Sequence, residues 1–284
     1  MGKKINNSYI GQRLPDITID EMKRKVKTKP KYALFLAHRY ENGIGVKKNL
    51  EKAYQWLEYA ISKPSSNWAN NRIATYLFNG WGVSQDREHA LCIWRANLIL
   101  INKALWKENT NIWEEHVYAW AKDIFMNANY NLGYCYLNGI AIERNIDIAL
   151  NYFKQSALIP NREALYALAK LYSGEYGLPQ NNCKAFRYRK SVCDYDFATS
   201  SDFHNVGVCY QKGIGVRKNV EKAFEYFKKA ADMGNPGSIM IVSNCYIYGM
   251  GVEQDFNKAF RYARKLLKMA KPNKSKRHAE SLTT

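Results

Sequence analysis

Residues 40–46 read YENGIGV, a tyrosine followed three residues later by the first of two glycines and then by a valine. A similar stretch begins at six places in the chain, at spacings of 36, 60, 36, 38 and 36 residues. Self-similarity at a nearly fixed period is typical of repeat proteins. The six copies begin at Tyr40, Tyr76, Tyr136, Tyr172, Tyr210 and Tyr246.

An alanine follows each glycine turn, ten residues after the first glycine in five copies and eleven residues after it in the fourth. Each alanine opens a run such as KAFEYFKKA, in which apolar residues recur at intervals of three and four, as on one face of a helix. A second helical run, such as ALAKLY, leads up to each tyrosine. Every copy is therefore predicted to be a helix, a turn and a second helix. The alanines are Ala53, Ala90, Ala149, Ala185, Ala223 and Ala259.

Glycine suits both positions of the turn, because the first can adopt the left-handed conformation that ends a helix and the second permits a tight reversal. Small residues stand three positions before five of the tyrosines and let the paired helices approach closely. One helix pair cannot bury its apolar faces alone, so neighbouring pairs must stack. We predict an all-α fold, a right-handed α-α superhelical solenoid of about six helix-turn-helix repeats. The small residues are Ala37, Gly133, Ala169, Gly207 and Ser243.

The pattern resembles the Sel-one-like repeats, relatives of the tetratricopeptide repeats, over residues 30–270. Three departures are Ala141 in place of the second glycine, an extra residue between Gly174 and Gly177, and Arg72 where leucine is usual. The resemblance implies an adaptor or scaffold that binds protein partners. The first copy matches the family pattern at Ala33, Leu36, Tyr40, Gly43, Gly45, Val46, Lys52, Ala53 and Trp56.

The formal net charge of +18 lies mostly at the two ends of the chain, where residues 1–31 carry +6 and residues 261–284 carry +7. Such basic ends either stay solvated or engage nucleic acid, anionic lipid or an acidic protein. No run of 18 apolar residues exists, so we expect no membrane span, and the first residues do not have the pattern of a secretory leader. The predicted domains are a basic N-terminal segment with a capping helix (1–29), the solenoid (30–270) and a basic disordered tail (271–284).

Six cysteines are present, and three of them occupy the same place in their repeats, directly before the tyrosine. Equivalent positions on stacked helices lie about 10 Å apart, whereas a disulfide needs Cα atoms within about 7 Å of each other. Reduced, buried thiols in a cytoplasmic protein are therefore expected. The three equivalent residues are Cys135, Cys209 and Cys245.

The interval between Tyr76 and Tyr136 exceeds a normal repeat by about 24 residues, and the excess falls at about 99–122. We interpret it as a lengthening of two helices that projects a hairpin from the solenoid. Trp106, Trp113 and Trp120 are spaced by seven residues in it. They either pack inside the hairpin or form a partly exposed anchor for a partner, since tryptophan is enriched at interface hot spots.

The first helices are expected to line an extended concave groove, as in other solenoids. Counting back six, five and two residues from each repeat tyrosine gives candidate partner-binding positions. The asparagines at the fifth position could pair with the backbone of an extended peptide, and the alternative is that all these positions are ordinary solvated ones. The candidates are Tyr130, Tyr166 and His204 (six back), Asn71, Asn131 and Asn205 (five back), and His38, Tyr134 and Lys170 (two back).

Helices flank the Gly-x-Gly turns on both sides, so the turns do not indicate a phosphate-binding loop, which follows a strand. No Cys-x-x-Cys and no recognisable nucleophile and base arrangement occurs, so no catalytic, metal or cofactor site is predicted. The leading prediction is a non-enzymatic scaffold for a protein or peptide. The alternatives are a dedicated inhibitor of the immunity type, which masks an acidic toxin or effector, and a basic nucleic-acid-binding protein.

Overall fold

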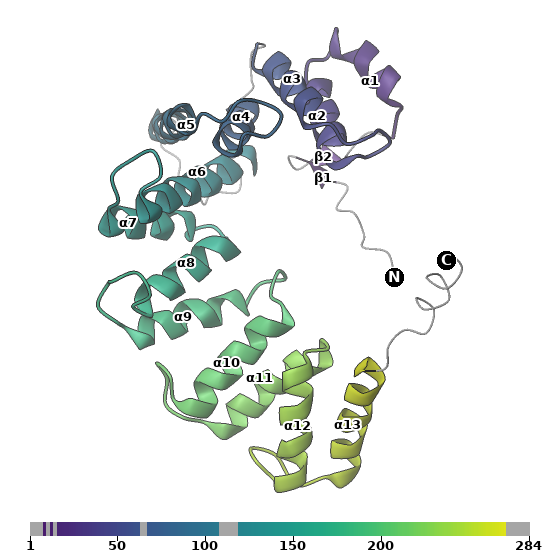
Figure 1. Ribbon diagram of the computed structural model, residues 1–284, viewed down its shortest axis with the longest axis vertical. Helices are drawn as coiled ribbons and strands as arrows, with labels where there is room; N and C mark the ends of the chain where they lie inside the picture. Colours follow the sequence, from purple (N-terminus) through teal and green to yellow (C-terminus); the bar gives the residue numbers. More distant parts are fainter. Residues whose placement is uncertain (1–7, 10–11, 14–15, 63–66, 108–118, 271–284) are drawn as a thin grey trace, which may run out of the picture. The chain divides into compact units, whose positions relative to one another are not determined.

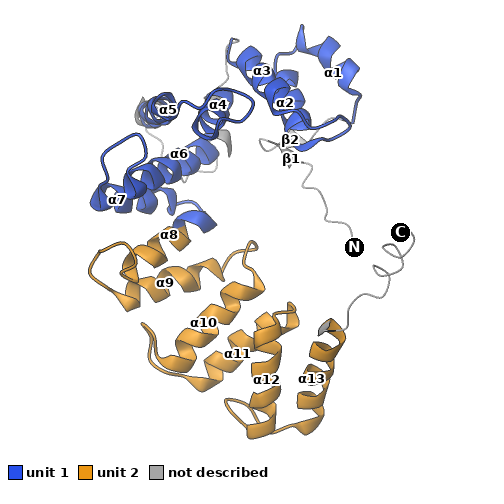
Figure 2. Cartoon of the chain, in the orientation of Figure 1, with its two compact units in different colours: residues 1–164 blue, residues 165–284 orange. Residues whose placement is uncertain are grey.

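A computed structural model describes residues 8–9, 12–13, 16–62, 67–107 and 119–270. The chain divides into two compact units, residues 1–164 and 165–284 (Figure 2). Thirteen helices and one pair of two-residue strands make up the described residues (Figure 1). The elements are β1 Ser8–Tyr9, β2 Gln12–Arg13, α1 Ile19–Val26, α2 Tyr32–Asn42, α3 Leu50–Ile61, α4 Asn67–Asn79, α5 Arg87–Lys107, α6 Ala119–Asn138, α7 Ile146–Ser156, α8 Arg162–Tyr172, α9 Asn182–Val192, α10 Ser200–Lys212, α11 Val220–Asp232, α12 Pro236–Tyr248 and α13 Phe256–Ala270.

The even-numbered helices from α2 to α12 are the first helices of the six repeats. The odd-numbered helices from α3 to α13 are the second helices. In unit 1, α1 packs on α2, and the pairs α2/α3, α4/α5 and α6/α7 stack in sequence order. In unit 2, α11 packs against both α10 and α12, and α12 packs against α13. The predicted all-α solenoid of helix-turn-helix repeats is confirmed. Strands β1 and β2, which pair antiparallel with Ser8 opposite Arg13, are the exception that the sequence did not predict.

Each turn is closed by one glycine and one asparagine or aspartate. The first glycine lies in the left-handed conformation, as at Gly213 with φ +75°, and ends the first helix. Six residues later, or seven in the fourth repeat, an Asn or Asp caps the second helix, as Asn219 does by accepting a hydrogen bond from the Lys222 N–H. The cap residue also donates its own N–H to the carbonyl of the repeat tyrosine, as from Asn219 to Tyr210. The six caps are Asn49, Asp86, Asn145, Asn181, Asn219 and Asp255.

This hydrogen bond corrects the register of the second repeat. The Asp86 N–H donates to the carbonyl of Leu77, not to that of Tyr76. Leu77 therefore occupies the tyrosine position, and Tyr76 occupies the position that a cysteine holds in three other repeats. By the same count, buried Ile73 takes the leucine position of the repeat, and Arg72 is not the departure from the pattern that the sequence suggested.

The second glycine has a role that the sequence did not indicate, because it brings neighbouring repeats into contact. In unit 2, a Cβ atom added to Gly251 would overlap the carbonyl oxygen of Val220, at the start of the preceding second helix. A Cβ atom at Gly215 would likewise overlap the carbonyl oxygen of Asn182, and one at Gly82 in unit 1 would overlap the peptide bond between Leu50 and Glu51. In the third repeat Ala141 stands in place of the second glycine, and its backbone adopts the left-handed conformation with φ +54°.

Close approach within a repeat depends on the small residues before the tyrosine, as predicted. A Cβ atom at Gly207 would lie 2.8 Å from the ring of Phe227, and one at Gly133 would lie 3.0 Å from the ring of Phe153. Ser243 uses its small hydroxyl instead, which donates to the carbonyl of Ala259 at 3.0 Å. The paired helices are therefore too close for a larger side chain at these positions.

The repeat tyrosine and the lysine of the Lys-Ala pair form a second recurring contact. In unit 2, the rings of Tyr210 and Tyr226 stack at 5.5 Å, and the Lys222 ammonium lies 5.8 Å from the Tyr210 ring centre. The same arrangement recurs at Tyr246, Tyr262 and Lys258. These cation-π and stacking contacts explain why the repeat keeps these residue types at this spacing.

All six cysteines are free, as predicted. Cys135, Cys209 and Cys245 are buried, and burial raises the pKa of the Cys135 thiol to about 12. Their position beside the repeat tyrosine places them in the cores of their units as small apolar groups. None of the described helices has the length and apolarity that a membrane crossing requires.

Candidate functional site

The longest helices of the described chain stand at the predicted insertion. Helix α5 has 21 residues and α6 has 20, whereas every other described helix has 15 or fewer. Trp106 belongs to α5 and Trp120 to α6, but the side chains of both lie outside the described residues, as does Trp113 altogether. Binding by these tryptophans therefore stays a prediction.

The predicted groove residues of unit 1 differ in their surroundings. Asn71 is buried, and in the corrected register it lies one position earlier in its repeat than half-buried Asn131 does in its own. Half-buried Tyr130 packs its ring 5.7 Å from that of Phe153, whereas Tyr134 is 42% exposed. The four residues therefore do not present one uniform surface.

His38 lies in the first repeat beside an ion pair that joins α2 to α4. Arg72 of α4 pairs with Glu41 of α2 and lies 5.8 Å from the ring centre of Tyr76. Burial, and next the positive charge of Arg72, lower the pKa of His38. His38 is therefore a neutral ring near pH 7, in contact with Asn42 at 3.1 Å.

In unit 2, His204 takes part in the packing between repeats. Its Nδ1 atom lies 2.8 Å from Oγ of Ser238 on α12, and its ring lies 5.5 Å from that of Phe227. Asn205 and Lys170 are exposed, and Lys170 lies 3.7 Å from Glu175. Tyr166 is half-buried. Of these four residues, Asn205 and Lys170 are the exposed ones, and Lys170 is in an ion pair with Glu175.

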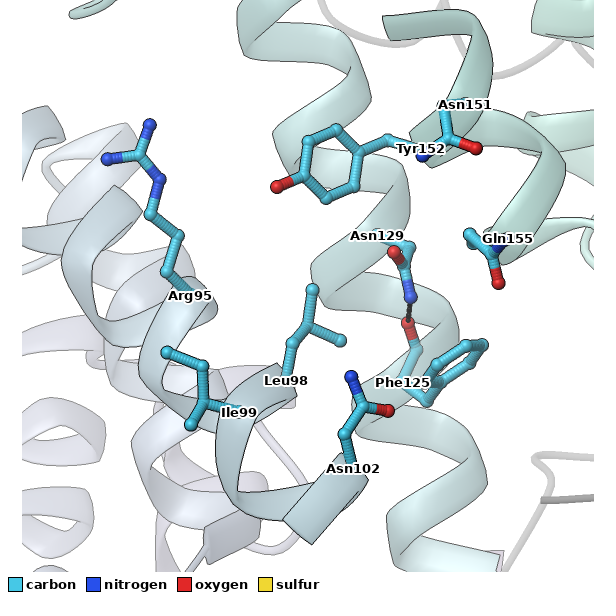
Figure 3. A pocket seen from close by; sticks show the side chains of 9 residues that line it. All are labelled: Arg95, Leu98, Ile99, Asn102, Phe125, Asn129, Asn151, Tyr152 and Gln155. Carbon is cyan, nitrogen blue, oxygen red and sulfur yellow. Dashed lines mark hydrogen bonds between the residues drawn. The ribbon is translucent and has the colours of Figure 1, made fainter. Parts of the chain in front are cut away.

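A cleft of about 420 Å³ opens between α5, α6 and α7, all within unit 1 (Figure 3). Leu98 and Ile99 of α5 and Phe125 of α6 form its apolar part. Figure 3 shows Asn102 of α5 and Asn129 of α6 directed into the space between the helices. Helix α7 supplies the remaining wall. The lining residues are Arg95, Leu98, Ile99, Asn102, Phe125, Asn129, Asn151, Tyr152 and Gln155.

Four side-chain amides line this cleft. Asn129 is buried and donates its Nδ2 hydrogen to the carbonyl of Phe125 at 2.7 Å, which fixes its orientation. Within the described residues, the amides of Asn102, Asn151 and Gln155 have no hydrogen-bond partner. Each amide offers a donor and an acceptor, as a peptide group does. The cleft can therefore pair with the main chain of a bound segment.

One end of the cleft is held by an arginine and two stacked tyrosines. Arg95 Nη2 donates to the Tyr136 hydroxyl at 3.0 Å, and the Tyr136 ring stacks on that of Tyr152 at 5.6 Å. Burial, and next Tyr136, raise the pKa of Tyr152, so its hydroxyl remains protonated and can donate a hydrogen bond. Arg95 and Tyr152 therefore give this end of the cleft polar groups that could recognise a ligand.

Sequence reasoning missed this cleft, because its residues come from three helices and none of them stands at a groove position of the repeat. Two signals pointed toward it: the extra length between the second and third repeats, and the amides on the helices that border the excess. Across the described ranges, no three His, Cys, Asp or Glu side chains gather as metal ligands would.

A second cleft, of about 340 Å³, lies within unit 2 between α11, α12 and α13. Its polar groups are mostly engaged with one another. Tyr262 donates to Asp232 at 2.9 Å, and Lys265 donates to the carbonyl of Ala231 at 2.6 Å. The cleft of unit 1 has the larger number of unpaired groups, so we take it as the candidate site.

Comparison with known proteins gives a match to the Sel1 repeat family model over more than half of the chain. The matched residues are 30–65, 69–91, 127–158, 162–188, 204–235 and 239–269. Each of these six segments falls on one of the six helix pairs described above, and the segment 69–91 covers only the start of α5.

Two curated relatives come from Schizosaccharomyces pombe. Chitin synthase regulatory factor 3 is 25% identical over 211 residues, covering 70% of this chain and 20% of the relative. Chitin synthase regulatory factor 2 is 35% identical over 78 residues, covering 27% of this chain and 15% of the relative. The chain thus spans a fifth or less of the length of these relatives.

A crystal structure of a Sel1 repeat protein from Oxalobacter formigenes is similar in fold. It has a TM-score of 0.53 and 21% sequence identity, and the match covers 90% of this chain and 89% of that protein. At this identity the likeness bears on the fold alone.

Proposed function

The chain belongs to the Sel1 repeat family, whose repeats generally mediate protein–protein interactions, and we propose that it is a non-enzymatic scaffold that binds a protein or peptide partner. The cleft between α5, α6 and α7 is the proposed contact surface. The observation that carries this proposal is the set of three unpaired amides in the cleft, on Asn102, Asn151 and Gln155.

The geometry favours an extended segment of the partner. Unpaired amides can replace the water that hydrates the main chain of a peptide, while Leu98 and Phe125 offer apolar contact for its side chains. A volume of about 420 Å³ suits a few residues and not a folded domain. The affinity would then depend on further contacts outside the cleft.

The predicted tryptophan insertion supplies such contacts in this proposal. Trp106 follows the cleft residues Ile99 and Asn102 on the same helix, α5. Trp106→Ala or Trp113→Ala is expected to weaken partner binding while the helix content stays unchanged, as circular dichroism would report. Loss of folding in both variants would instead assign the tryptophans to packing of the hairpin.

A reducing cytoplasmic compartment is part of the same proposal. All six cysteines are free, including exposed Cys92 and Cys183, which is the state that reducing compartments maintain. The basic ends of the chain add electrostatic attraction to an acidic partner.

The experiment is affinity capture from the native host with the full chain, followed by mass spectrometry. The double variant Asn151→Ala/Gln155→Ala removes two cleft amides, and Gln55→Ala/Gln211→Ala removes two exposed amides elsewhere as the matched control. Recovery of the captured proteins is expected to fall about tenfold with the first variant and to stay unchanged with the second.

Nuclease treatment separates this function from nucleic-acid binding. Captured proteins that persist after nuclease treatment support the proposal. Captured material that disappears after nuclease treatment, or equal recovery by both double variants, would refute the cleft as the protein-binding surface.

A further inference from the structure

The second helices of the last three repeats carry a phenylalanine at one equivalent position, directly after the repeat alanine. In unit 2, the Phe186 ring meets the Tyr210 ring of the next repeat edge-on, at 5.3 Å and 84°. The Phe224 ring meets Tyr246 in the same way, at 5.3 Å and 86°. Phe260 holds this position in α13 and is 68% exposed.

Phe260 belongs to an apolar ridge on α13, which we define as Phe256, Phe260 and Leu267. Spacings of four and seven residues place the three on one helix face. Phe256 is 64% exposed and Leu267 66% exposed. The residue of α11 equivalent to Leu267 is Ala231, which is fully buried. Phe260 and Leu267 thus occupy positions that are buried on α11, whereas Val220, the α11 equivalent of Phe256, is 40% exposed.

Charge distinguishes the possible occupants of the ridge. Helix α13 contains five Lys and Arg residues and no Asp or Glu. Lys258 pairs with Asp255, and Lys265 donates to the carbonyls of Ala231 and Asp232. Arg264 and Lys268 are exposed and have no ion pair with a described residue. An acidic occupant would therefore be attracted to the ridge.

A second copy of the chain and the chain's own residues 271–284 fit the ridge less well than an acidic partner does. A second copy would bring an identical basic helix against the first, and like charges would oppose the contact. The segment 271–284 carries four Lys and Arg residues against one Glu, has no Phe, Tyr or Trp, and has Leu282 as its single large aliphatic residue. Neither complements the aromatic and basic character of α13.

We propose that the ridge on α13 binds an acidic amphipathic helix of a partner protein. An aromatic side chain of that helix packs edge-on against Phe260, as Tyr246 packs against Phe224, and its acidic residues face Arg264 and Lys268. The apolar face of the partner helix covers Phe256 and Leu267. The proposal does not depend on the cleft of unit 1.

Helix α12, which packs against α11 in this protein, provides the sequence of the probe. A labelled peptide with the sequence of α12, Pro236–Tyr248, carries the tyrosine that seats on Phe224. Changing its exposed positions Met240, Asn244 and Tyr248 to Glu gives the acidic probe, and changing them to Lys gives the basic probe. Binding of each probe to the full chain is measured by fluorescence anisotropy.

The acidic probe is expected to bind at least about tenfold more tightly than the basic probe. Phe260→Ser or Leu267→Ser is expected to weaken binding at least about tenfold. Leu158→Ser is the matched control, because Leu158 is also exposed, at 51%, and lies outside the ridge. A probe that carries Ala in place of Tyr246 should also bind more weakly.

Several results would overturn the proposal. Absence of saturable binding of the acidic probe up to about 1 mM would do so, as would equal binding by Phe260→Ser and Leu158→Ser. A dimer in sedimentation that Phe260→Ser abolishes would identify a second copy as the occupant. Tighter probe binding by Leu282→Ser would show that the chain's own residues after Ala270 occupy the ridge.

Discussion

The Nδ1 atom of His204 lies 2.8 Å from the Oγ atom of Ser238, so one hydrogen bond joins the first helices of the last two repeats. Ser238 is fully buried and His204 is half-buried against Phe227. A position that the sequence suggested for partner binding thus stabilises the stacking of neighbouring repeats.

This contact predicts a dependence of stability on pH. Burial lowers the pKa of His204 below its ordinary value of 6.5, so the unfolded state binds a proton more readily than the folded state. The neutral ring's contribution to stability is complete above pH 6.5 and is lost as the pH falls below 6.5 through the lowered folded pKa. The urea midpoint should fall between about pH 7.5 and pH 5, and less steeply in His204→Gln. An equal slope in both proteins would contradict this.

The second glycines predict a matched pair of substitutions. Alanine at Gly45 or Gly251 enters the left-handed region and should cost about 1–2 kcal/mol at either site. At Gly251 the new methyl group also overlaps the Val220 carbonyl, which should add about 1–3 kcal/mol. Gly45 lacks that neighbour, since its nearest atom is the Arg39 guanidinium at 3.6 Å. Chemical denaturation that gives equal losses would disprove the role of Gly251 in stacking.

The contact of Gly207 with Phe227 predicts coupling between two substitutions. Gly207→Ala alone should destabilise the chain by about 1–3 kcal/mol through overpacking. Phe227→Leu removes the ring that the new methyl group would meet, so the double variant should lose less than the two single losses combined. A double-mutant cycle by denaturation measures this coupling, and strict additivity would argue against it.

Thiol labelling should distinguish the cysteines by burial. Exposed Cys92 and Cys183 should react first with an alkylating reagent in the native chain. Cys135 should be protected until unfolding, because it is buried and the pKa of its thiol is raised to about 12. Cys193 should also react slowly, since burial raises the pKa of its thiol to about 11. Mass spectrometry over time gives the order, and early labelling of Cys135 would contradict the buried placement.

The repeat architecture could be predicted because its determinants are local. A glycine such as Gly213 ends a helix by its own conformation, and a small residue such as Gly207 faces the partner helix a fixed number of residues away. These rules repeat six times, so the fold class, the helix pairs and the free buried cysteines follow from spacing alone.

Placing the register of the second repeat by its tyrosine puts it one residue out. The repeat alanine follows the tyrosine by 13 residues in the other five copies, and Leu77, not Tyr76, stands 13 residues before Ala90. The hydrogen bond from Asp86 to the Leu77 carbonyl agrees with this spacing. With this one-residue shift, Asn71 lies six residues before the tyrosine position of its repeat, not five. It is therefore not equivalent to Asn131 and Asn205.

What the sequence alone determined is the repeat: its length, its turn, its two helices and the residue types that let one helix approach the next. What only the tertiary structure decided is which surfaces remain uncovered. Phe224 and Phe260 are the same residue at the same place in two repeats, yet one is buried and the other is 68% exposed. The physical reason is that exposure depends on whether another helix covers the side chain, and a local pattern does not record that. The cleft between α5, α6 and α7 follows the same rule, because three helices must meet before its amides share one space.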